Sequence, residues 1–326
     1  MNLFRAELAR YIARRGIALL MLAGFAVVIG LAARTAWETR PPSPSELATA
    51  SANATFAAHD PQVRAQITAC QKHPARYLGP GSQAAQCAKA LAPTAESLLP
   101  RSPLSLRHEL NSSGAQVAVL LAAAIVIAGA TFAGADWQTG AMRTQLIARR
   151  RRSVLWSTKA AAVVAWSALY GAAGFGLYWL ILGSVAQSRD ISGAGGLTST
   201  TLHHILAMGG RAVVLTAAAG LGAFALTMLL RHTVATLGLL FAYAAGGEVL
   251  LALLPVTGAT RWSVGVNLFG WLQSNFHYTE QSLRCRAVET CGKPHALSHL
   301  DAGLFLGALL VIAVVASMIS FSKRDV

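Results

Sequence analysis

Long apolar runs constrain this chain more than any other feature. Six stretches built mostly of Ala, Leu, Val and Gly recur along the 326 residues. A helix needs roughly 20 such residues to cross a bilayer core of about 30 Å. Only helices and closed barrels satisfy their backbone polar groups in lipid, and these runs are too long for barrel strands. The sequence therefore predicts membrane-spanning helices at 16–33, 115–135, 160–186, 212–230, 234–254 and 302–321.

The composition agrees with this prediction. The chain is 54% hydrophobic and only 12% charged, whereas a soluble domain has about a quarter charged residues. Four arginines precede the first run, as in the basic region of a signal peptide, but its length favours a retained span. We expect an all-α, multi-pass integral membrane protein with six transmembrane helices.

The distribution of positive charge predicts the orientation of these helices. With the N-terminus in the cytoplasm, the inside segments are 1–15, 136–159, 231–233 and 322–326, and they hold thirteen of the 27 Lys and Arg residues. These segments have about a third of the length of the outside segments, so their positive charge is denser, as the positive-inside rule requires. Both termini are therefore expected to be cytoplasmic. The net charge of +14 is attributed to topology and not to nucleic-acid binding.

The predicted spans and the segments between them divide the chain into five regions. The first part, 1–33, combines an amphipathic interfacial helix at 1–15 with the first span. An extracytoplasmic segment, 34–114, contains Ala-rich helical stretches but few large apolar residues, which predicts a small helical cap. Spans two to five occupy 115–254. Segment 255–301 is an outside piece whose Trp262 to Trp271 stretch lies at the interface or re-enters the membrane, and 302–326 holds the last span and a basic tail.

All four cysteines fall in predicted outside segments, where disulfides persist. Local bridges, Cys70–Cys87 and Cys285–Cys291, are the simplest of the three possible pairings. Free thiols or a metal site are the alternatives, although neither spacing fits the usual zinc ligand pattern.

Segment 136–159, DWQTGAMRTQLIARRRRSVLWSTK, is the most distinctive inside segment. Met142, Leu146 and Ile147 give it a weak apolar stripe beside Arg143, which predicts a short amphipathic helix at the membrane surface. The simpler interpretation is a basic loop that binds anionic lipid, and lipid is the expected partner for most of Arg149, Arg150, Arg151 and Arg152.

This segment resembles the membrane subunits of bacterial ABC exporters of the type-two permease class, and the actinobacterial members in particular. Those subunits leave the second span through an acidic residue, Trp, Gly, a hydrophobic residue, Arg and Leu. An arginine-rich turn, Val-Leu and a Lys then open the third span. The matching positions are Asp136, Trp137, Gly140, Met142, Arg143, Leu146, Arg149 to Arg152, Val154-Leu155 and Lys159. The tail FSKRDV and the stretch RSPLSLRHEL are also similar. The chain departs from the pattern where Asp136 replaces the usual Glu and where the arginine turn is shorter.

The resemblance implies a transport subunit that is not itself an enzyme. In that family the segment after the second span is a coupling helix that docks on a separate ATPase, and Asp136 and Arg143 are the preferred contact candidates. ATP and Mg would be bound by that partner, because the only Gly-Lys here, Gly292-Lys293, is followed by Pro294 and forms no phosphate-binding loop. The resemblance further implies a second permease copy or homologue, an export direction and the bacterial cytoplasmic membrane.

Within the predicted spans, Glu248 is the only acidic residue. Ionisable groups in membrane helices usually face a bundle interior or water, so Glu248 is a transport-path candidate. The alternative is a carboxyl near the outer interface that bonds to a neighbouring helix. Glycines at 171, 174, 176, 220 and 222 predict close helix packing, and His203-His204 is expected in a solvated loop and not at a metal site.

Other functional classes stay open. A secondary carrier would show inverted repeats with broken helices, and none is evident. A ligand-binding assembly or sensor protein is compatible with the predicted cap. A membrane hydrolase would need a nucleophile and a base, and no histidine lies in a predicted span.

Overall fold

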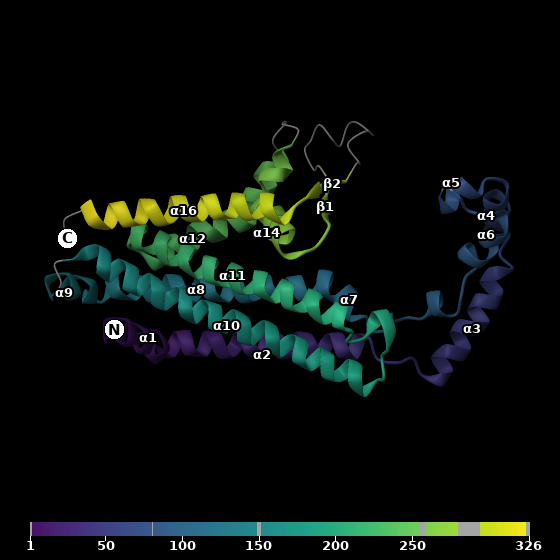
Figure 1. The fold of residues 1–326 in the computed structure, drawn as a ribbon, viewed down its shortest axis with the longest axis horizontal. Coiled ribbons are helices and arrows are strands. Elements are labelled where there is room, and N and C mark those ends of the chain that lie inside the picture. The colour runs from purple at the N-terminus through teal and green to yellow at the C-terminus, as the bar shows by residue number, and fades with distance from the viewer. Residues whose placement is uncertain (1, 80, 149–150, 254–257, 280–293, 324–326) are drawn as a thin grey trace. The chain divides into compact units, whose positions relative to one another are not determined.

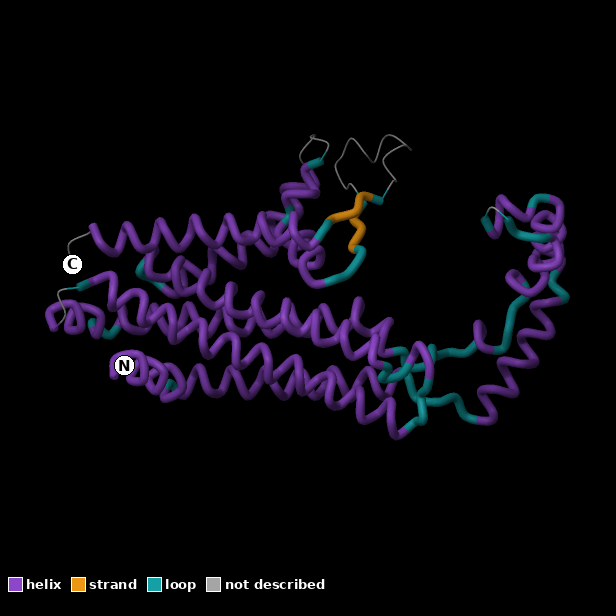
Figure 2. Tube along the Cα trace, viewed as in Figure 1, coloured by secondary structure: helices purple, strands orange, loops and turns teal. Residues whose placement is uncertain are grey.

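The computed structural model describes residues 2–79, 81–148, 151–253, 258–279 and 294–323 (Figures 1 and 2). The chain forms two compact units, one made of 1–32 with 105–326 and the other of 33–104. The first unit contains the helical bundle and the second contains the predicted cap. The two units are described separately below.

Six helical segments of the described chain are long and apolar enough to cross a membrane. This finding confirms the six predicted spans and the multi-pass membrane class. Most of the helices run beyond the predicted apolar runs, because flanking polar residues continue the helix past the bilayer core. The segments are α2 (Arg15–Glu38), α7 (Leu106–Glu109) continued through η2 (Leu110–Gly114) into α8 (Ala115–Gln138), α10 (Arg152–Ser188), α11 (Ser199–Leu230), α12 (Thr233–Ala242) continued through η4 (Tyr243–Gly247) into α13 (Glu248–Leu253), and α16 (His299–Lys323).

Helix α8 forms the centre of the bundle. In the most apolar part of the helix that contains α8, 61% of the residues are buried. The corresponding buried share is 6% for the α12–α13 segment and 11% for α16. Helices α8, α10 and α11 pack against one another, whereas the apolar side chains of α16 and α12 are largely exposed. Apolar side chains left uncovered on long hydrophobic helices are expected where lipid is the solvent.

Small residues let the central helices approach closely. A Cβ atom placed on Gly129 of α8 would lie 2.8 Å from the backbone oxygen of Gly220 in α11. Gly171 and Gly174 of α10 are in similarly tight places, beside Thr216 and Leu121. The predicted packing role is therefore confirmed for the glycines at 171, 174 and 220. It is wrong for Gly176, which has open space around it, and Gly222 has only an ordinary contact with Leu310.

One end of the bundle gathers three segments that are distant in sequence. Helix α1 (Asn2–Ala13), helix α9 (Ala141–Ala148) and the C-terminal end of α16 lie at this end (Figure 1). The predicted helix at 1–15 is confirmed, and α1 packs against α10. The indole of Trp166 in α10 donates a 3.1 Å hydrogen bond to the carbonyl of Leu8 in α1.

The part of the chain between α13 and α16 contains a short helix and two short strands. After η5 (Ala259–Trp262), helix α14 (Val264–Leu272) leads into β1 (Phe276–Tyr278), which pairs antiparallel with β2 (His295–Leu297). Helix α14 is held against α11 and α16, because Trp271 Nε1 donates to the Arg211 carbonyl at 3.0 Å and His299 Nδ1 lies 2.9 Å from the Gly270 carbonyl. The strands were not predicted, and these three-residue segments are too short to give a sequence pattern.

The expectation for His203-His204 is wrong in one respect. Both residues lie in the first turns of α11, not in a loop. Their side chains are exposed, and no group of three or more potential metal ligands occurs among the described residues.

The second unit consists of short helices, as the Ala-rich stretches predicted: α3 (Pro44–Ala58), α4 (Pro61–Lys72), α5 (Pro74–Leu78), α6 (Ala84–Leu91) and η1 (Glu96–Leu98). Pro44 begins α3, and its missing N–H costs nothing there, because the first helical turn leaves that N–H unpaired. The Ser43 hydroxyl accepts from the Glu46 N–H, and the Glu46 carboxylate accepts from the Ser43 N–H at 2.7 Å.

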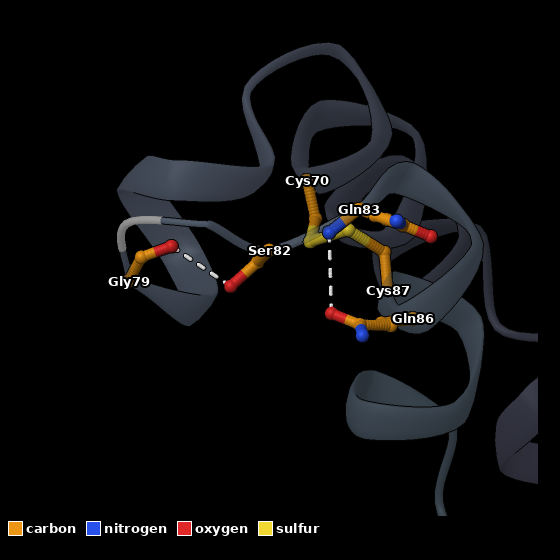
Figure 3. Close-up of a disulfide and its surroundings, with 6 residues drawn as sticks. All are labelled: Cys70, Gly79, Ser82, Gln83, Gln86 and Cys87. Atoms are coloured by element: carbon orange, nitrogen blue, oxygen red, sulfur yellow. Dashed lines mark hydrogen bonds between the residues drawn. A yellow bond between two sulfur atoms is a disulfide. The ribbon is translucent and has the colours of Figure 1, made fainter.

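A disulfide between Cys70 and Cys87 joins α4 to α6 and confirms that predicted pairing (Figure 3). Both cysteines are fully buried. The loop between the two helices is ordered by Ser82 Oγ, which donates to the Gly79 carbonyl at 2.8 Å, and by the Gln83 N–H, which donates to Gln86 Oε1 at 3.1 Å (Figure 3). Cys285 and Cys291 lie outside the described residues.

Candidate functional site

The segment between the second and third spans folds into a turn and a short helix. Helix α8 ends at Gln138, and Gly140 then takes φ +72°. Glycine suits this left-handed conformation because it has no Cβ to clash. The Arg143 N–H donates to the Gly140 carbonyl at 3.0 Å, which closes the first turn of α9. The predicted amphipathic helix is therefore present.

Helix α9 has an inner and an outer face. Met142 is fully buried and Leu146, one turn later, packs against the same hydrophobic cluster. Arg143 and Ile147 are also one turn apart, and both are exposed, Ile147 by 87%. The predicted stripe was therefore wrong for Ile147, which points away from Met142 and Leu146. The outer face combines a cation with a large apolar side chain.

A buried cluster of charges lies behind α9, where α1, α8 and α10 meet. Lys159 Nζ is 2.6 Å from Asp136 Oδ2 and 2.9 Å from Glu7 Oε2. Arg14 Nη2 is 2.5 Å from Asp136 Oδ1. Lys159, Glu7 and Asp136 are each at most 2% exposed. We call Glu7, Arg14, Asp136 and Lys159 the charge cluster.

The groups of the charge cluster satisfy one another. Two carboxylates face the Lys159 ammonium and the Arg14 guanidinium, and the partly exposed Arg10 adds a third cation 2.7 Å from Glu7 Oε1. Arg14 Nη1 also donates to the carbonyl oxygens of Phe132 at 2.7 Å and of Thr131 at 3.2 Å, near the end of α8. These residues lie about two turns before the end of α8, and a carbonyl oxygen has a second lone pair that can accept a guanidinium N–H in addition to its helical N–H.

Two aromatic rings, those of Phe132 and Tyr11, cover one side of the charge cluster. The cations of Arg14 and Lys159 lie 4.9 Å and 5.3 Å from the centre of the Phe132 ring, and Tyr11 packs against the same ring. Tyr11 is fully buried and its burial raises the pKa of its hydroxyl. Because charges are strongly desolvated in such a place, removing one partner of a buried pair typically costs about 3–5 kcal/mol.

Asp136 has a different role from the one that its sequence position suggested. Its carboxylate is buried and holds both Lys159 and Arg14, so it is not exposed for direct contact with a partner chain. Trp137 is likewise engaged within the bundle, where the Arg231 guanidinium lies 4.7 Å from the centre of its ring and Phe321 packs against it edge-on. Of the two preferred contact candidates, Asp136 and Arg143, only Arg143 is exposed and so accessible to a partner chain.

Sequence reasoning missed Glu7 and Arg14 as site residues and used Lys159 only as part of a family pattern. One signal was available. Glu7 is the only acidic residue among the first 15 positions, within a segment that carries four arginines. Arg151 precedes α10 and is exposed, Arg152 begins that helix, and Arg149 and Arg150 lie outside the described residues.

Glu248 occupies a separate site, at the start of α13. Ser263 Oγ donates to its Oε2 at 2.5 Å and the Gly265 N–H donates to its Oε1 at 3.0 Å. The carboxylate therefore caps the N-terminus of α14, where unpaired N–H groups favour negative charge. The alternative that a neighbouring helix satisfies Glu248 is confirmed, and its place in a transport path stays a prediction.

The fold and these sites define an α-helical, multi-pass membrane protein with a buried charge cluster behind a short surface helix. No family model, curated protein or solved structure matches the chain.

Proposed function

We propose that this chain is the membrane-spanning permease subunit of an ATP-driven exporter of the ABC type. Helix α9 would be the coupling helix that a separate ATPase contacts. The single observation that carries the proposal is the construction of α9: an inner face fixed to the bundle and an outer face that presents Arg143 and Ile147.

The charge cluster supplies the mechanical part of this proposal. Lys159 joins the base of α10 to the end of α8 and to α1 through two short ion pairs. A displacement of α9 would therefore move α1, α8 and α10 together, because buried ion pairs and close-packed side chains deform little. In this proposal, closure of the ATPase moves the bundle between inward-facing and outward-facing states.

The proposal also includes a topology and an assembly. Both termini and α9 would face the cytoplasm of a bacterial cell, with 33–104 as a cap on the other side. Six spans would form half of a transport pathway, so a second copy or a homologue completes it. ATP and Mg would be bound by the partner ATPase alone.

The test is purification of the tagged chain from its native membranes, followed by identification of bound proteins and measurement of ATP hydrolysis. Charge reversal by Arg143→Glu together with Ile147→Asp should lower both ATPase recovery and turnover about tenfold or more, since central interface residues commonly contribute 2 kcal/mol or more. Asp136 is unsuitable for this test because its substitution would disturb the charge cluster.

Arg107→Glu is the matched control, because Arg107 is also an exposed arginine and lies in α7 at the other end of the bundle. This variant should keep ATPase recovery and turnover unchanged. The proposal fails if no ATPase accompanies the wild-type chain, or if the double variant recovers and activates the ATPase as the wild type does.

A further inference from the structure

A cavity lies beside Glu248. It has a volume of about 290 Å³, near the lower limit of the roughly 300–1,000 Å³ that ligand pockets occupy. Its wall comes from α13, η5, α14 and the segment that contains β1. The lining residues are Glu248, Leu251, Thr260, Ser263, Val266, Phe276, His277, Tyr278 and Thr279.

The Glu248 carboxylate is held in place before any ligand arrives. Ser263 and Gly265 each donate one hydrogen bond to a different carboxylate oxygen. Tyr243 Oη, one turn before Glu248, accepts from the Val264 N–H at 3.1 Å and fixes the same junction. An ionised carboxylate has about four acceptor positions, so both oxygens keep capacity for a further donor.

The electrostatics of the cavity favour a cation. Among the described residues that line the cavity, Glu248 is the only one with a fixed charge, and none is Lys or Arg. The N-terminus of α14 offsets only about half an elementary charge. Arg261, next to the lining residue Thr260, lies 3.9 Å from Asp301, so its charge is directed to a carboxylate outside the cavity.

The remaining walls suit an apolar or aromatic body. Leu251 and Val266 are aliphatic, and Phe276 and Tyr278 offer aromatic rings. Phe276 is stacked on Phe269 of α14, and Tyr278 packs against His295 of β2, so both rings are supported from outside the cavity. Aromatic faces attract ammonium groups as well as apolar surfaces.

We infer that this cavity binds a small organic monocation: a primary or secondary amine that carries an apolar or aromatic group. The ammonium would donate to Glu248 and the apolar group would lie between Val266, Phe276 and Tyr278. A hard metal ion fits less well, because calcium takes six to eight oxygen ligands and the cavity offers one carboxylate. The inference does not depend on the exporter proposal, since binding needs no ATPase.

The experiment is calorimetric titration of the purified full chain in phosphatidylglycerol nanodiscs at pH 7. The probes are 2-phenylethylamine, its neutral analogue 2-phenylethanol and the anion 3-phenylpropionate, with calcium chloride as a separate arm. We expect saturable binding of the amine, and binding of the alcohol that is weaker by about tenfold or more, because a charge-assisted hydrogen bond is lost.

Two variants locate the site. Glu248→Gln keeps the shape and one acceptor oxygen but removes the charge, and it should weaken amine binding by a similar factor. Val266→Trp should fill the cavity without touching the cap of α14, and it should abolish binding even if Glu248→Gln does not fold. Glu38→Gln removes an exposed carboxylate that is not among the lining residues and should leave amine affinity unchanged.

Repeating the titration with phosphatidylethanolamine in the nanodiscs identifies the source of the amine. If this lipid competes with the amine probe, a lipid headgroup is the occupant. If it does not compete, the occupant is a free amine. The inference is overturned if amine and alcohol bind equally, if both site variants bind the amine as the wild type does, or if calcium alone binds in a Glu248-dependent way.

Discussion

The ammonium of Lys159 lies 2.9 Å from the carboxylate of Glu7, although 152 residues separate them in the chain. The same ammonium lies 2.6 Å from Asp136. One side chain therefore joins the N-terminal helix α1, the central span α8 and the third span α10.

The first prediction concerns this link. Lys159→Met should lower the free energy of unfolding by about 3–5 kcal/mol, because Glu7 and Asp136 would be left buried with less compensation. Thermal unfolding of the purified chain in detergent measures the effect. Arg34→Met is the control, because the Arg34–Glu38 pair is exposed, and it should change the unfolding temperature very little. Equal shifts in the two variants would refute a special role for the charge cluster.

The second prediction concerns the contact between α8 and α11. Gly129→Ala should destabilise the bundle by about 1–3 kcal/mol, because the added Cβ would meet the Gly220 backbone oxygen, which no side-chain rotation can move. Gly176→Ala makes the same chemical change where nothing lies within 4 Å, and it should be neutral or slightly stabilising. Thermal unfolding in detergent measures both variants. A Gly129→Ala variant as stable as the wild type would show that α8 and α11 can move apart without loss of stability.

The third prediction concerns the disulfide of the cap. In a chain that carries Cys285→Ser and Cys291→Ser, thiol labelling after denaturation should require prior reduction. Replacing both Cys70 and Cys87 by Ser should destabilise the cap by about 3 kcal/mol, since the bridge closes a loop of 17 residues. Protection of α4 and α6 in hydrogen–deuterium exchange measures this loss. Labelling without reductant would contradict the bridge.

The fourth prediction concerns pH. The Ser43 N–H has the largest part in lowering the pKa of Glu46 below its usual 4.5, and the Ser43 hydroxyl and Arg101 lower it further. A lowered pKa means that the ionised form stabilises the folded cap above pH 4.5, and that this stabilisation is lost as the pH falls through the lower, folded-state value. Hydrogen exchange of α3, corrected for intrinsic rates, should show this loss in the wild type. Glu46→Gln should remove it, and the two chains should converge in acid.

The sequence was sufficient for the spans because each is a continuous run of one physical character. The run from 115 to 135, for example, reappears inside α8 with its polar end at Asp136 and Trp137. The same local reasoning found Cys70–Cys87, which joins neighbouring helices of one small unit.

The charge cluster could not be predicted in this way. Nothing in the residues around Glu7 indicates a partner in α10, because that pairing depends on how α1 folds back against the bundle. Which residues of α9 face the bundle was also hard to predict. In a helix of eight residues, a small change in the direction of the axis decides whether Ile147 or Leu146 faces inward. The hydrogen bonds that Glu248 accepts from the N-terminus of α14 could not be predicted either, because the start of α14 was not known from the sequence.

The long separation between Glu7 and Lys159 also has a consequence for biogenesis. A ribosome adds about 5–20 residues per second, so Glu7 and Arg14 wait on the order of ten seconds before Lys159 is made. During that time the first span can be inserted, but α1 lacks the ammonium that fixes it to α10. The N-terminal helix is therefore among the first segments to be synthesised, and it reaches its final place only after the third span has entered the membrane.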